Sequence, residues 1–378
     1  MTRSAAVFGA LVLLSVPVRG AGQSLSTGAV LQTFTIEDAP QSAVADVQVL
    51  TLPVVGVWER GPWGVQVRSA YTDAIVTFGG GGYAERAGPT DTHLRASYAF
   101  GPVLVTGLAD LATGDARYGA GELPLLGALG SDLLPVTGGS WGAGGSVGGE
   151  VALRGLTGQG SYVLSAGYVR QSAFEPLTGF GADYRPGNQL RVRAAMDRRF
   201  AVASVLSFAA GYQRFSGDVL EGAEVFRAGA RWEAEVAFAH PLGSRESFSV
   251  SAGMYRRMIG GLPVAEPDSL LSTEGLATSP ERTLVALSAE AQATRGRVSL
   301  APELGLRLLS TGDDVGAGWL ASAGARAQVL ILGGRYGDRL LVTPAARLHV
   351  GSVSPLVDAA SAVRGWEVGI SARWERGL

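Results

Sequence analysis

The feature that most constrains this chain is a two-residue alternation of apolar and polar side chains, which recurs from about residue 63 to residue 374. In segment 224–240, Phe226, Trp232 and Phe238 fall on the apolar even positions, whereas Glu233 and Glu235 fall on the odd ones. Successive side chains of a β-strand point to opposite faces, so each such segment predicts a strand with one apolar and one polar face. Many long segments of this kind are typical of a membrane barrel with lipid outside and water inside.

Residues 1–22 resemble a secretory signal peptide. Arg3 precedes an apolar stretch over 5–18, and the small residues Gly20, Ala21 and Gly22 follow it. The stretch is shorter than the ~20 residues that a membrane helix needs, and small residues at its end suit a signal peptidase. We therefore expect a cleaved leader, with an uncleaved anchor as the alternative.

Composition excludes several classes of site and partner. The chain has no cysteine, so it has no disulfide and no thiolate metal ligand. Its net charge is −2 and would be −4 without Arg3 and Arg19, which is not the basic balance of a nucleic-acid-binding protein. The composition shows no linker after the leader, so we expect one barrel over 23–378.

Short and long connections alternate along the chain, as do the periplasmic turns and external loops of outer-membrane barrels. Long connections are expected at 79–90, 113–140, 173–187, 215–222, 260–280 and 352–361, with a shorter one at 311–316. The predicted strands are 27–36, 45–58, 63–78, 91–100, 102–112, 141–154, 159–172, 188–197, 201–214, 223–240, 246–258, 281–294, 297–310, 317–332, 339–351 and 362–376. This pattern predicts an all-β, antiparallel, up-and-down transmembrane barrel of sixteen strands in the bacterial outer membrane. Fourteen remains the alternative if the first residues enter the lumen as a plug and one later strand pair is misread.

The polar faces of these strands are expected to line the lumen with charges of both signs. These charges can form a path that selects ions. The alternative is that they pair with one another and stabilise the barrel wall. The predicted lumen-lining residues are Arg95, Arg191, Arg193, Arg227, Arg231, Glu233, Glu235, Glu303, Arg307, Arg326, Arg347 and Arg373.

The external loop at 113–140 contains an unusually apolar segment over 122–134. Exposed leucines on an external loop indicate self-packing, insertion into the lumen, or capture of an apolar ligand. For the last of these, the predicted ligand-binding residues are Leu123, Leu125, Leu126, Leu129 and Leu133.

Two short motifs flank this region. The first runs through Gly88, Pro89, Thr90, Asp91 and Thr92, and the second reads Leu111, Ala112, Thr113 and Gly114. Over about 30 residues they resemble the phenol-degradation (meta-pathway) outer-membrane barrels, relatives of the long-chain fatty-acid and toluene transporters. The resemblance implies uptake of small hydrophobic molecules through external loops and a lateral opening, in a barrel that usually has fourteen strands.

Catalysis is not expected. The three histidines, His93, His240 and His349, are isolated, and no Gly-x-Ser-x-Gly elbow accompanies Ser352 or Ser354 near His349. The sequence carries no metal, phosphate or haem motif, so we predict no catalytic residue, no metal and no cofactor.

The expected function is passive uptake of small hydrophobic or amphipathic molecules. A general diffusion porin is the alternative, followed by a structural or adhesive surface barrel. The expected partners are outer-membrane lipid, small apolar solutes and the barrel-assembly machinery.

Overall fold

The computed structural model describes residues 22–41, 43–136, 141–179, 181–200, 204–261, 279–312, 316–333, 338–356 and 359–376. The predicted leader therefore lies outside the described residues, apart from Gly22. In the described part, no helix has both the length and the apolar character that a membrane span requires.

The first half of the chain forms nine barrel strands and two short helices. These elements are β1 (Gln23–Ile36), β2 (Val44–Arg60), β3 (Trp63–Phe78), β4 (Tyr83–Pro89), β5 (Thr92–Phe100), β6 (Val103–Leu111), a 3-10 helix (Ala120–Glu122), α1 (Leu123–Leu129), β7 (Ser146–Thr157), β8 (Gly160–Gln171) and β10 (Gln189–Arg199).

The second half completes the wall with β11 (Val205–Phe215), β14 (Arg231–Pro241), β15 (Glu246–Arg257), β16 (Arg282–Arg295), β17 (Val298–Thr311), β18 (Gly318–Gly333), β19 (Arg339–Leu356) and β20 (Ala359–Arg376). A separate small sheet consists of β9 (Tyr184–Arg185), β12 (Gly217–Leu220) and β13 (Ala223–Arg227).

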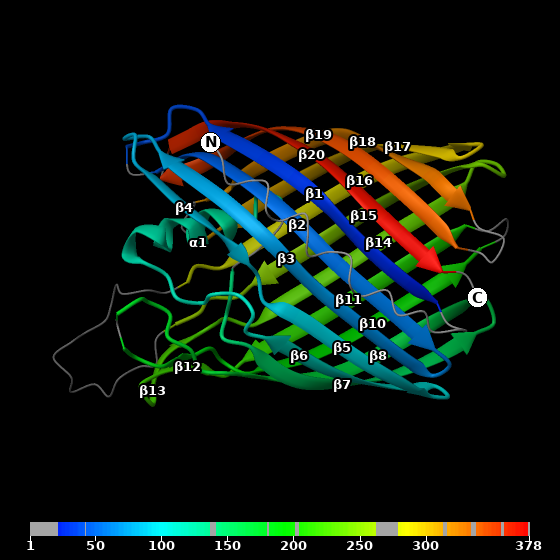
Figure 1. The fold of residues 1–378 in the computed structure, drawn as a ribbon, viewed down its shortest axis with the longest axis horizontal. Helices are drawn as coiled ribbons and strands as arrows, with labels where there is room; N and C mark the ends of the chain where they lie inside the picture. The colour runs from blue at the N-terminus through cyan, green and yellow to red at the C-terminus, as the bar shows by residue number, and fades with distance from the viewer. Residues whose placement is uncertain are drawn as a thin grey trace.

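Antiparallel pairing closes the wall into a barrel of sixteen strands (Figure 1). β4 and β5 lie end to end along β3, so the 17 strands of the main sheet fill sixteen positions. Closure is between the first and last strands, where β1 pairs with β20 from Gln23 opposite Arg376 to Ile36 opposite Val363. The predicted sixteen-stranded barrel is confirmed.

The outer surface is apolar, because one face of each strand points to it. Aromatic pairs lie near both ends of the wall, with ring centroids 4.6 Å apart for Trp63 and Tyr98 and 4.5 Å apart for Tyr212 and Trp232. Exposed apolar side chains between them include Leu300, Leu304, Leu308, Val368 and Ile370. An apolar band between aromatic girdles is the surface of a barrel embedded in the bacterial outer membrane.

Two predicted loops are instead extensions of strands. The connection expected at 79–90 is a hairpin in which β4 continues the ladder with β3. The connection expected at 352–361 is occupied largely by the ends of β19 and β20. Both strand pairs therefore extend through residues whose turn-like composition predicted a loop.

The strand predicted at 223–240 is wrong in its first part. Residues 223–227 form β13, which turns back on β12 through Glu221 and Gly222, both at positive φ. Two successive positive φ values are typical of a two-residue hairpin turn. A hairpin outside the barrel alternates its side chains as a barrel strand does, so the pattern could not separate the two.

Candidate functional site: the lumen and its inward loop

The inner wall has an apolar part that the alternation did not predict. It is formed by inward side chains of the first three strands, Phe34, Val47, Val49, Ala74 and Val76, each at most 1% exposed. On these strands the outward face is also apolar, as at Leu50 and Leu52, so the sequence signal is weak. A water-filled lumen would not bury these side chains, and something else must cover them.

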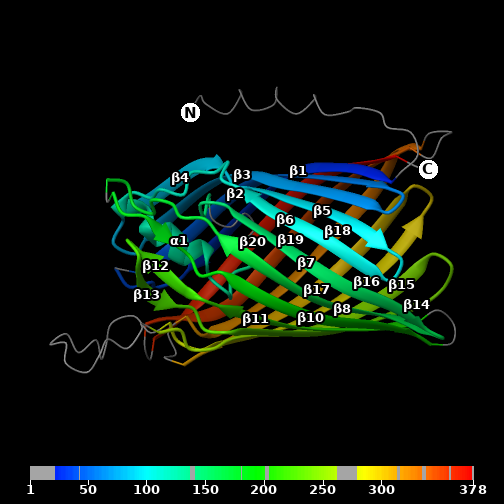
Figure 2. The same cartoon turned by 90° about the horizontal axis from the view of Figure 1, so that it is seen from below.

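The cover is the segment 112–145, which joins β6 to β7. Leu125, Leu133 and Trp141 have no exposed surface and pack in one cluster with the apolar wall. In two perpendicular views α1 lies within the outline of the barrel, at the end that carries β12 and β13 (Figures 1 and 2). We call the described residues 112–136 and 141–145 the inward loop.

Arg86 on β4 is the first anchor of the inward loop. Its guanidinium lies 2.8 Å from the Glu122 carboxylate, donates to the Arg117 carbonyl at 2.8 Å, and stacks 4.3 Å from the ring centre of Tyr118. Only 9% of the Arg86 side chain is exposed. A buried cation that is paired and hydrogen-bonded in this way fixes the position of the groups around it.

Two side chains next to this anchor have shifted pKa values. The backbone N–H of Arg117 donates to the Asp115 carboxylate and lowers its pKa, against the opposing effect of partial burial. Burial raises the pKa of the Tyr118 hydroxyl, and the nearby Arg86 partly opposes that rise. At neutral pH, Asp115 is therefore charged and Tyr118 is neutral.

Asp91, at the break between β4 and β5, holds both ends of the inward loop. One carboxylate oxygen accepts from Gly114 N–H at 3.1 Å and the other from Ala143 N–H at 2.8 Å. At Gly114 a Cβ atom would lie 1.5 Å from the Trp141 carbonyl oxygen, so only glycine fits. The Thr113 hydroxyl also donates to the Thr90 carbonyl at 3.0 Å. The two sequence motifs thus meet as one structural clamp.

The far side of the inward loop reaches the opposite strands. Arg307 donates to the Asp132 carbonyl at 2.9 Å, and Arg282 lies 3.4 Å from the Asp132 carboxylate. On the other side, Gln32 donates to the Pro135 carbonyl at 2.8 Å. The inward loop is therefore attached to both sides of the lumen and narrows it.

The five predicted ligand-binding leucines do not share one environment. Leu125 and Leu133 are fully buried, Leu126 and Leu129 are partly buried against the same cluster, and Leu123 is 42% exposed. Self-packing accounts for the buried ones, while Leu123 retains a free apolar surface.

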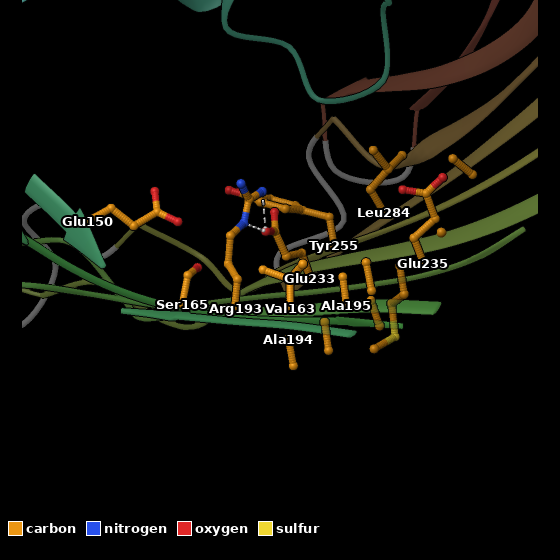
Figure 3. Close-up of a pocket in the computed structure, with 16 residues that line it drawn as sticks. Glu150, Val163, Ser165, Arg193, Ala194, Ala195, Glu233, Glu235, Tyr255 and Leu284 are labelled. Carbon is orange, nitrogen blue, oxygen red and sulfur yellow. Dashed lines mark hydrogen bonds and ion pairs between the residues drawn. The ribbon is translucent and has the colours of Figure 1, made fainter. Parts of the chain in front are cut away.

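The wall from β7 to β16 lines a cavity of about 530 Å³, in which four charged side chains stand among alanines and other apolar residues. Figure 3 shows Glu150, Arg193, Glu233 and Tyr255 projecting on one side of the wall, with Arg193 bonded to Glu233. Glu235 and Leu284 line the same cavity further along.

Ion pairs on the inner wall join strands that are not neighbours. Arg193 of β10 lies 2.6 Å from Glu233 of β14, across Gly211 of β11. Arg347 of β19 lies 2.5 Å from Glu303 of β17, across Gly324 of β18. At Gly211 a Cβ atom would come within 2.4 Å of the Glu233 carboxylate. Glycine on the middle strand leaves room for the pair.

The other predicted lumen residues differ in their surroundings. Arg326 pairs with Glu290 at 2.7 Å, and Arg373 pairs with Glu375 at 2.9 Å. Arg95, Arg191 and Glu235 line cavities of the inner wall. Arg307 contacts the inward loop, and Arg231 stacks on the Phe215 ring. Arg227 does not belong to the barrel wall, because it lies on β13 and pairs with Glu224 at 2.9 Å.

The histidines are dispersed. His93 lies 2.5 Å from Asp110, and His240 lies 2.7 Å from the Ser204 hydroxyl. His349 packs against the Phe34 ring, with centroids 5.2 Å apart. In the described ranges no group of three or more His, Cys, Asp or Glu residues could hold a metal ion.

Several important residues were not selected from the sequence. Arg86 lies in the predicted connection 79–90, Trp141 lies at the start of the predicted strand 141–154, and Asp132 lies in the predicted loop 113–140. Arg282, at the start of β16, lies opposite Arg257, and its position near the start of the predicted strand 281–294 is the signal that could have found it.

No protein-family model matches the chain. No curated protein matches it either. The resemblance to the phenol-degradation barrels is therefore not shown as membership, and the sixteen strands also differ from the fourteen usual in that family.

Solved structures with a similar overall trace are outer-membrane proteins. The outer membrane channel DcaP of Acinetobacter baumannii is 9% identical, with a TM-score of 0.44 over 95% of this chain and 99% of that one. OmpT of Vibrio cholerae is 10% identical, with a TM-score of 0.42 over 95% and 99%. OccK5 of Pseudomonas aeruginosa is 10% identical, with a TM-score of 0.44 over 95% and 99%. These identities assign no family, and the fold rests on the chain's own strand pairing.

Proposed function

We propose that the protein is an outer-membrane channel through which small solutes diffuse passively. The observation that carries the proposal is the division of the lumen. The inward loop covers the apolar wall, and the wall from β7 to β16 keeps a cavity of about 530 Å³ whose lining includes Glu150, Arg193, Glu233 and Glu235. A loop that narrows a lumen with charged groups on its wall, without filling it, is what a diffusion channel needs to select by size and charge.

Reconstitution into a planar bilayer tests this proposal. The purified, refolded protein is expected to give discrete, steady conductance steps. A variant that lacks residues 119–136 should give larger steps, because the narrowing segment is gone. Heat-modifiable gel migration of both proteins checks that each barrel has folded. Folded wild-type protein without conductance would overturn the proposal.

Uptake of apolar molecules is a second candidate, and it rests on the exposed Leu123 at the start of α1. Burial of a leucine side chain contributes ~1.5–3 kcal/mol, so a ligand that covers Leu123 would gain measurable affinity. Liposome uptake of a radiolabelled aromatic hydrocarbon, compared with Leu123→Ser, tests this candidate. Equal uptake by both proteins would remove it.

A further inference from the structure

Strand register places four arginines in one row across five neighbouring strands. Arg191 of β10 lies opposite Gln213 of β11, which lies opposite Arg231 of β14. Arg231 lies opposite Arg257 of β15, and Arg257 lies opposite Arg282 of β16. Neighbouring strands are ~4.8 Å apart, so the row spans about 19 Å of the inner wall. We call these four residues the arginine row.

The arginine row carries more positive charge than the described wall neutralises. Like charges directly opposite one another destabilise a strand pair, and this occurs twice, between Arg231 and Arg257 and between Arg257 and Arg282. In the described part of the chain, the ion pair made by the row is between Arg282 and Asp132, at 3.4 Å. The nearby Glu233 is already paired with Arg193.

Several guanidinium N–H donors of the arginine row have no hydrogen-bond acceptor among the described residues. The Nε atoms of Arg231, Arg257 and Arg282 are shielded from solvent and have no hydrogen-bond acceptor among the described residues. Arg191 donates to a neutral group, the Gln189 amide oxygen. A shielded guanidinium N–H without an acceptor is costly, and a planar oxyanion is the group that satisfies it, through two parallel hydrogen bonds.

Apolar side chains next to the row indicate what such an anion carries. The Arg231 guanidinium stacks on the Phe215 ring, 4.8 Å from its centre. Tyr255 and Leu284 lie opposite one another, two residues along the strands from Arg257 and Arg282 on the same face. The wall thus offers guanidinium groups beside an apolar surface. This combination suits an organic carboxylate better than a small inorganic anion.

We propose that the arginine row is a binding track for small carboxylates with an apolar body, on the external side of the channel. The row lies at the β14 start, the β15 end and the β16 start, toward the end of the barrel where β12 and β13 lie (Figure 1). The proposal rests on the channel function and specifies its substrate class. A carboxylate passes from one arginine to the next while its apolar part follows Tyr255 and Leu284.

Benzoate is the probe for this proposal, measured in the same planar bilayers. Wild-type channels in a KCl gradient should be anion-selective, and external benzoate should block the current at millimolar concentration or below. The double variant Arg231→Gln with Arg257→Gln should shift the reversal potential toward that of a non-selective channel. It should also weaken the benzoate block at least about tenfold.

Two variants serve as controls. Arg373→Gln removes a lumen cation that is paired with Glu375 at 2.9 Å, away from the row, and should leave the block within about twofold of wild type. Arg257→Lys keeps the charge but not the fork, and should retain anion selectivity while it loses part of the block. If the double variant fails to refold, the single Arg257→Gln variant is measured instead.

The outcomes separate the two proposals. Folded wild-type protein without conductance overturns the channel function. Conductance without anion preference, or benzoate block that the double variant leaves unchanged, overturns the carboxylate track alone. Equal block by benzoate and by acetate would show that the apolar surface plays no part, and would also overturn the track as proposed.

Discussion

The guanidinium of Arg86 lies 2.8 Å from the carboxylate of Glu122, and this contact joins the barrel wall to the residue directly before α1. The same guanidinium donates to two backbone carbonyls, those of Arg117 and Asp115. One side chain of the wall therefore determines where the inward loop begins its path across the lumen.

Replacement of Arg86 by Met should release the inward loop. The Glu122 side chain is 32% exposed, so loss of the pair costs less than the ~3–5 kcal/mol of a fully buried pair, but it removes an attachment of a segment that the ladder does not hold. We expect noisier and larger conductance, with faster proteolysis within residues 112–136. Arg256→Met is the matched control, because its pair with Glu281 is at the surface and such pairs contribute about 0–1 kcal/mol. Equal behaviour of the two variants would contradict the anchor role.

Replacement of Gly114 by Ala should displace the start of the inward loop. The added Cβ atom would lie 1.5 Å from the Trp141 carbonyl oxygen, whereas at Gly121 it would meet no atom within 4 Å. We expect Gly114→Ala to lower the yield of heat-modifiable barrel or to open the loop to protease, and Gly121→Ala to do neither. Normal assembly and protection of Gly114→Ala would show that the clamp at Asp91 is dispensable.

Leu125→Ser and Leu123→Ser separate packing from capture. Leu125 is fully buried and Leu123 is 42% exposed. Truncation of a buried leucine costs about 2–5 kcal/mol, so Leu125→Ser should loosen the loop and raise conductance. Leu123→Ser should leave conductance unchanged and affect only the uptake of apolar solutes. Proteolysis of the loop in detergent is the independent readout.

The small sheet of β9, β12 and β13 should respond to alkaline pH. The Tyr184 hydroxyl donates to the Asp218 carboxylate at 2.5 Å. Burial, and then this bond and the Asp218 charge, raise the pKa of Tyr184 above its usual value of 10.0. The bond's contribution to stability is therefore complete below pH 10 and is lost as pH rises through the raised pKa. Just above pH 10, wild type and Tyr184→Phe should therefore show the same rise in tyrosine absorbance at 295 nm, because Tyr184 stays protonated in the wild type. A larger rise in the wild type would contradict the raised pKa.

The absence of cysteine makes the orientation directly measurable. Ala223→Cys lies in the hairpin of β12 and β13, which the predicted orientation places outside the cell, and Leu242→Cys lies at a short turn where the native side chain is 61% exposed. A membrane-impermeant maleimide should label the first in intact cells and the second only after the outer membrane is opened. The reverse order would mean that the short turns face outward.

The sequence predicted the barrel well because alternation is a local signal. Every barrel strand has one lipid-facing side, and Leu300, Leu304 and Leu308 show it within nine residues. The position of the inward loop depends instead on distant contacts, such as Trp141 N–H with the Thr72 carbonyl, 69 residues away, and Gln32 with Pro135, 103 residues away. No periodicity in one segment reports contacts of that range.

The sequence predicts the individual residues of the candidate site but not how they group. The alternation places Arg191, Arg231, Arg257 and Arg307 on inner faces, but only the register of β15 against β14 and β16 shows that Arg231, Arg257 and Arg282 lie in one row. Register depends on turn geometry, and the external connections here vary too much in length to fix it from the sequence.

Gly211 and Gly324, each between the two partners of an ion pair, give a different meaning to the abundance of glycine in this chain, which has 55. Glycine in a barrel is usually explained by bending of the sheet. At these two positions it acts as a spacer, because an empty site on the middle strand lets charges on the flanking strands reach across it. A glycine-to-alanine scan of the inner wall would therefore alter the electrostatics of the passage before it altered the shape of the cylinder.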